Sequence, residues 1–395
     1  LPGIAYAQVG PAVFLSYFLG GLCALIGTLA TIELATAMPL AGGIYYYTER
    51  SLGPLAGTVS GILNWAAISL KTAFAIYGLS IMMVQFSGGR ISFLWWSCGI
   101  TVFFLGVNLI GTKVAAWAQI VMVVLLLAVM FGFIGGLAPE FTGSRFRPLL
   151  FDGKGVSDIV YVAAFVFVAF GGLLDVASVS EEVKNPRRNL PLGMIAAIVA
   201  VTLLYTGVLI TLVSVMPGEE LARSATPLAD AARMYFGNWG FWVLNFGAIM
   251  AFVTTANAGI MAAARFPLAL SRDKLIPGIF SRVYGKKALP LPSLLVTGTA
   301  IVIALFLDLE RLVEAASTVI MLSFVLTNLS VIILRESELQ NYRPSFRVPW
   351  YPLVPLVGML SFTWLIVQMG LGSVQISLAI IAFSVLLYFS FGRKV

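Results

Sequence analysis

Apolar residues form long runs along the whole chain, separated by short clusters of glycine, proline and charged residues. Most runs reach about 20 residues, the length at which an α-helix crosses a hydrocarbon core of about 30 Å. The pattern predicts eleven membrane-spanning helices after a helical stub at residues 1–8. The predicted helices cover residues 12–38, 54–84, 92–110, 114–137, 157–181, 191–216, 239–270, 291–308, 312–334, 350–370 and 374–391.

Residues 217–236 interrupt this pattern, because they carry two glutamates, an aspartate and two arginines. We expect an amphipathic segment outside the membrane there. No other stretch has the composition of a soluble domain, so one transmembrane domain is expected over residues 1–395. The chain begins at Leu1 without an initiator methionine or a charged leader. We therefore expect an N-terminal fragment that contains part of the first helix to be missing.

The composition is that of an all-α membrane protein. Hydrophobic residues make up 60% and charged residues 10%, with a mean hydropathy of +0.99, whereas about 25% of a soluble domain is charged. The net charge of +7 comes from basic residues spread over short loops, so no nucleic-acid partner is expected. Histidine is absent, and Cys23 and Cys98 lie in apolar runs. No metal site, cofactor or enzymatic activity is expected.

The positive charges also predict an orientation. Placing the loop after residue 38 on the cytoplasmic side puts most of the 24 Lys and Arg residues inside, as the positive-inside rule requires. The C-terminus is then cytoplasmic. We expect a multi-pass protein of the cell membrane, surrounded by lipid.

The predicted helix 157–181 contains the pair Gly171-Gly172, which loosens regular winding. Irregular backbone inside a membrane is tolerated where it lines a protein-walled cavity. Broken helices present half-helix ends and unpaired backbone groups that can hold a charged solute. This pattern predicts a solute-binding site at the break, and at least one of Phe167 and Phe170 is expected to face it.

Several polar residues lie inside apolar runs. Lys71 has no charged neighbour within ten positions, and a lone ammonium in the bilayer costs roughly 3 kcal/mol. It should face a cavity, a carboxylate or free carbonyls, and it is a candidate proton-coupling group or else a structural tether. Glu33 or Asp175 could pair with Arg265 as an inner gate, although both acids could be packing residues bonded to backbone.

Thr254 and Thr255 offer hydroxyls that could contribute to a sodium site. Hydroxyl pairs inside helices more often satisfy carbonyls of their own helix, and both alternatives stay open.

Five segments, in order, resemble motifs of the amino acid/polyamine/organocation transporters, and the similarity extends over nearly the whole chain. They are Leu1 to Gly3, Pro39 to Tyr47, Phe170 to Pro191, Arg265 to Pro277 and Arg343 to Pro352. The resemblance implies a leucine-transporter-like fold, with a 5+5 inverted repeat followed by two C-terminal helices. It also implies that backbone carbonyls of Phe170, Gly171, Gly172 and Leu173 receive the amino group of the substrate.

The function implied by this resemblance is secondary active transport of amino acids by alternating access. No acidic residue lies directly at the break, which favours neutral amino acids, although cationic amino acids and polyamines stay open. The driving force is expected to be a proton first, exchange second and sodium third. A transporter-like amino acid receptor is the alternative from another class.

Overall fold

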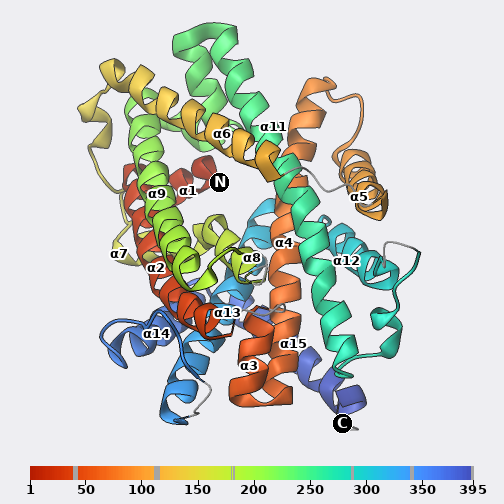
Figure 1. Ribbon diagram of the computed structural model, residues 1–395. Coiled ribbons are helices and arrows are strands. Elements are labelled where there is room, and N and C mark those ends of the chain that lie inside the picture. Colours follow the sequence, from red (N-terminus) through yellow and green to blue (C-terminus); the bar gives the residue numbers. More distant parts are fainter. Residues whose placement is uncertain are drawn as a thin grey trace.

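The computed structural model describes residues 1–38, 43–110, 116–178, 180, 183–285, 289–338 and 342–392. Over these residues the regular structure is helical, apart from one isolated β-bridge between Tyr284 and Leu289. The α-helices (Figure 1) are α1 (Pro2–Val9), α2 (Val13–Ala37), α3 (Ile44–Leu52), α4 (Pro54–Phe86), α5 (Phe93–Ile110), α6 (Ala116–Leu137), α7 (Val156–Phe165), α8 (Gly172–Ser178), α9 (Pro186–Val215), α10 (Gly218–Arg223), α11 (Pro227–Arg272), α12 (Leu291–Ala304), α13 (Leu309–Glu336), α14 (Leu353–Gln368) and α15 (Leu371–Phe391).

The helices have the length and composition of membrane spans. In the part of the chain that the structure describes, eight helical segments are long and apolar enough to cross a bilayer. Three shorter apolar helices, α5, α12 and α14, match the remaining predicted runs. The outer faces of α6 and α15 are apolar as well, with Leu125 and Leu386 more than half exposed. The chain is therefore an all-helical, multi-pass membrane protein, as the sequence predicts.

The helices pack in two main groups. On one side α2 lies along α9, and on the other α4 lies along α11 and α13 (Figure 1). Glycine permits the close approach within each group. A Cβ added to Gly21 of α2 would lie 2.3 Å from Thr202 Oγ1 of α9, and one added to Gly259 of α11 would lie 2.1 Å from Thr72 Oγ1 of α4. Small residues at crossing points are the usual basis of close helix packing in lipid.

The polar segment at 217–236 forms α10 and the first part of α11. Gly237 has φ +64°, so the backbone leaves the helical conformation there. A position in the left-handed region suits glycine. This change of direction coincides with the predicted boundary between the amphipathic segment and the membrane span that begins near residue 239.

Candidate solute-binding cavity

The predicted helix 157–181 is interrupted over the residues that lead up to its glycine pair. Regular α-helix ends at Phe165, a 3-10 helix covers Val166–Phe170, and α8 starts at Gly172. The hydroxyl of Ser317 on α13 bridges the interruption. Its Oγ donates to the Phe165 carbonyl at 2.7 Å and accepts from the Val168 N–H at 2.9 Å. A neighbouring helix thus satisfies backbone groups that the lost α-helical turn leaves without partners.

The two glycines serve packing and open space. Gly171 has an ordinary helical φ of −67°, so backbone freedom is not what this position requires. A Cβ added there would lie 2.7 Å from Ile320 Cδ1 of α13, while a Cβ on Gly172 would meet nothing within 4 Å. Gly171 therefore permits close contact with α13, and Gly172 leaves room on the opposite side.

A cavity of about 550 Å³ lies beside the interruption, with walls from α2, α4, α6, α9 and α11. The broken segment contributes Val168, Ala169, Gly172 and Asp175. A 3-10 helix has three residues per turn, and positions three apart also share a face of the following α-helix. Ala169, Gly172 and Asp175 are spaced by three, which is why this stripe faces the cavity.

The same winding turns the two predicted phenylalanines away. Phe167 is fully buried, with its ring 6.0 Å from Phe324 and 5.5 Å from Phe362. Phe170 packs on Tyr205 at 5.7 Å, and Tyr205 rather than Phe170 lines the cavity. The expectation that one of these phenylalanines faces the cavity is therefore wrong, because the 3-10 winding over Val166–Phe170 directs both rings toward the core.

The remaining predicted residues of the break divide between the cavity and the core. Gly172 lines the cavity. Gly171 packs against α13, and the Leu173 side chain is buried at 7% exposure in the main hydrophobic cluster. These two positions therefore contribute to packing, Gly171 through the close approach of its backbone to α13 and Leu173 through its side chain.

Lys71 and Asp175 form an ion pair inside the cavity, between α4 and α8. The Lys71 side chain is 11% exposed and that of Asp175 36% exposed. An isolated lysine in a membrane helix is expected to meet a carboxylate or a cavity. Lys71 meets both, because its partner Asp175 lies in the same cavity. The sequence marks both residues as candidates but does not indicate that they pair.

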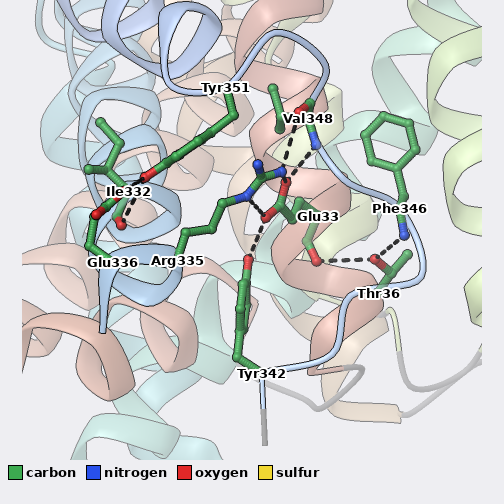
Figure 2. Close-up of polar contacts among 9 residues, drawn as sticks. All are labelled: Glu33, Thr36, Ile332, Arg335, Glu336, Tyr342, Phe346, Val348 and Tyr351. Atoms are coloured by element: carbon green, nitrogen blue, oxygen red, sulfur yellow. Dashed lines mark hydrogen bonds and ion pairs between the residues drawn. The ribbon is translucent and has the colours of Figure 1, made fainter. Parts of the chain in front are cut away.

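Glu33 has different partners from those predicted (Figure 2). Its buried carboxylate accepts from Arg335 Nε at 2.7 Å and Nη2 at 2.5 Å, from the Tyr342 hydroxyl at 2.8 Å and from the Val348 N–H at 2.6 Å. The predicted pairing of Glu33 with Arg265 is therefore wrong, since both Glu33 oxygens are engaged by α13 and the loop after it. Arg265 lies on α11 with an exposed side chain.

This Glu33 cluster joins α2, the end of α13 and the following loop. Burial, followed by the nearby Glu33 carboxylate, raises the pKa of the Tyr342 phenol above its usual value. Arg335 also stacks over the Tyr351 ring at 4.3 Å, and the Tyr351 hydroxyl donates to Glu336. The sequence pattern counted Arg335 as a cytoplasmic loop charge and gave no signal that it reaches Glu33.

Thr254 and Thr255 both line the cavity from α11. The Thr254 hydroxyl lies 2.9 Å from both the Met250 and Ala251 carbonyls of its own helix. This matches the alternative in which the hydroxyl satisfies carbonyls of its own helix. Among the residues that the structure describes, no group of three or more His, Cys, Asp or Glu side chains could hold a metal ion.

A cavity between membrane helices, walled by a broken helix and carrying one internal ion pair, is the arrangement of a membrane carrier for a small solute. Comparison with known families matches residues 2–391 to the amino acid permease family. The chain therefore belongs to that family, and the resemblance described above is confirmed. The family and the relatives below are transporters.

Three relatives illustrate the range of the family. A methylthioribose transporter of Bacillus subtilis is 28% identical, covering 99% of this chain and 88% of that protein. The branched-chain amino acid permease BcaP of the same organism is 26% identical, covering 100% and 88%. The mitochondrial cationic amino acid transporter 3 of Arabidopsis thaliana is 28% identical, covering 84% of this chain and 58% of the plant protein.

Proposed function

We propose that this protein is a secondary active transporter that moves a neutral amino acid across the cell membrane by alternating access. The observation that carries the proposal is the interrupted α7–α8 segment, which lines a 550 Å³ cavity next to the Lys71–Asp175 pair. Interrupted helices at mid-membrane are where carriers place the charged groups of their substrates. The family supports the general class of substrate.

The lining of the cavity supports a neutral substrate. The Lys71 and Asp175 charges offset each other, so a solute with a net charge would enter without a compensating group. Much of the remaining wall is aromatic or aliphatic, including Phe74, Leu209 and Phe252. A small or branched apolar side chain fits such a wall. The relative named as a branched-chain amino acid permease supports the same choice.

The proposed architecture is the 5+5 inverted repeat with two further helices, α14 and α15, and a cytoplasmic C-terminus. In this arrangement the segment from Phe170 to Leu173 offers backbone carbonyls to the substrate amino group. Alternating access then requires the helices around α8 to move against those around α4 and α11. α2 packs most extensively on α9 and α4 on α11, which supports such a division, and α13 contacts both α2 and α4.

We propose a proton as the coupling ion and Lys71 as the residue that carries it, because its carboxylate partner lies in the same cavity. Loss of the proton would abolish the ion pair and free α8 from α4. Exchange is the next mode to test. A sodium site at Thr254 and Thr255 comes last, since the Thr254 hydroxyl is engaged with its own helix.

Uptake of labelled amino acids into liposomes that contain the full-length protein tests the proposal. Uptake of neutral amino acids should rise with an imposed pH gradient and stay unchanged with a sodium gradient. Methylthioribose and arginine are added as competitors. Inhibition of uptake by one of them would indicate the substrate class of the methylthioribose transporter or of the cationic amino acid transporter, respectively. Absence of uptake for every amino acid would overturn the proposal.

The role of Lys71 has a separate control. Lys71→Met should abolish the response of uptake to the pH gradient. Lys154→Met is the matched variant, because Lys154 also pairs with an aspartate, Asp158, but at a more exposed position at the start of α7. Gradient dependence that persists in Lys71→Met would rule out the proton-coupling role.

A further inference from the structure

The charged side chains of the cavity are confined to one pair. Among the described residues that line it, Lys71 and Asp175 are the side chains with a formal charge at neutral pH. They contact each other directly in the wall of the cavity. An amino acid also carries one positive and one negative group, so the pair presents the same two charges as the proposed ligand.

The pair also joins α4 to α8, two helices that share α3 as a neighbour but otherwise pack on different helices. α8 packs on α2 and α3, whereas α4 packs on α11, α13 and α3. Lys71 and Asp175 therefore link α4 to the short helix that follows the interruption. Any molecule that inserts between the two charges separates α8 from α4.

There is room for a ligand on the Asp175 side. Gly172 lies three residues before Asp175 on the same face and has open space where a side chain would project. The Asp175 side chain is 36% exposed, while Lys71 is largely covered at 11%. Asp175 Oδ1 is buried, so a ligand in this space would approach Oδ2, the atom that Lys71 contacts.

We propose that the amino acid divides this ion pair, so that Lys71 binds its carboxylate and Asp175 binds its ammonium group. This inference rests on the proposed function and adds the two side chains that recognise the ends of the zwitterion. The ammonium and carboxylate of an α-amino acid are attached to one carbon, so they fit between two partners that otherwise touch. One ion pair is replaced by two, and no buried charge is left unpaired.

The division of the pair has a consequence for selectivity. A cationic amino acid brings a third charge, for which the described lining residues offer no second carboxylate. An amine without a carboxylate cannot pair with Lys71, and an acid without an amino group cannot pair with Asp175. Both analogues should therefore bind about 10- to 100-fold more weakly than the parent amino acid, as expected for one lost interaction with a charged group.

Equilibrium binding to the purified full-length protein tests this inference. The probes are leucine and alanine, each with its decarboxylated amine and its deaminated acid. In Lys71→Met the parent should bind no more tightly than its amine, because carboxylate recognition is gone. In Asp175→Asn the parent should bind no more tightly than its acid. Equal weakening of the parent and both analogues in each variant would indicate a structural role and overturn the inference.

Two further variants guard against misfolding, since removing one partner of a buried pair is destabilising. Lys71→Arg keeps the cation and should keep the preference for ligands with a carboxylate. The double variant Lys71→Met/Asp175→Asn leaves no isolated charge and should bind the parent, amine and acid with equal, weak affinity. Persistent discrimination in the double variant would also overturn the inference.

Lys154→Met serves as the control and should keep the wild-type pattern. If the wild-type protein binds no amino acid, the inference and the proposed function fail together. If it binds the parent amino acid but the Lys71 and Asp175 variants keep the wild-type discrimination, only the inference fails.

Discussion

Replacing Glu33 by glutamine tests the strongest polar cluster that the structure describes. The Glu33 side chain is fully buried and that of Arg335 is 17% exposed. The change removes the negative charge but keeps the shape, and it leaves the guanidinium facing an amide (Figure 2). Breaking a buried ion pair by removing one partner costs about 3–5 kcal/mol.

This cost translates into a measurable shift. Unfolding entropy is about 2 cal/mol/K per residue, so over 395 residues the loss lowers Tm by about 4–6 °C. Thermal unfolding of the purified protein in detergent measures it. The matched control is Glu336→Gln, which removes an exposed carboxylate one position from Arg335 and should shift Tm by about 1 °C or less. Equal shifts in the two variants would refute the reasoning.

Three further changes have defined outcomes. Ser317→Ala removes the hydroxyl that bridges the helix break and should cost about 1–3 kcal/mol in thermal unfolding, whereas Ser323→Ala, whose hydroxyl bonds its own helix, should change little. The pKa of Tyr342 is raised in the folded protein. The stabilisation from the neutral Tyr342 phenol is therefore present below pH 10 and declines as the pH rises further. Tyr342→Phe should reduce the loss of Tm between pH 8 and pH 11. Gly21→Ala should lower Tm because the added Cβ meets Thr202, while Gly99→Ala, with open space around it, should not. Unchanged Tm in Ser317→Ala or Gly21→Ala, or an identical alkaline loss in Tyr342→Phe, would contradict these predictions.

The helices and the interruption could be predicted because their signals are local. Apolar runs give the membrane spans, and the Gly171-Gly172 pair lies directly after the 3-10 helix Val166–Phe170 that interrupts the α-helix. The direction of Phe167 and Phe170 could not be predicted, because it depends on how many residues the turn contains. Ser317, which stabilises the break, is an ordinary serine in an apolar helix and has no sequence signal.

Ion-pair partners were harder to predict than the charged residues themselves. A lone lysine in an apolar run identified Lys71 as a residue that needs compensation, but its partner Asp175 lies 104 positions away. Glu33 and Arg335 are 302 positions apart. Such pairs depend on which faces of distant helices meet, and one sequence contains no information on that register. The inner-gate prediction failed for Glu33 for this reason.

Protection of a cysteine at the helix break by substrate tests the central claim most directly. Ala169→Cys places a thiol in the cavity wall, in a background in which Cys23 and Cys98 are replaced by alanine. Thr142→Cys, at an exposed loop position, is the control. The account predicts that a saturating transported amino acid slows labelling of Ala169→Cys by a water-soluble thiol reagent but leaves Thr142→Cys unaffected. Equal labelling of Ala169→Cys with and without substrate, in protein that still takes up the amino acid, would contradict it.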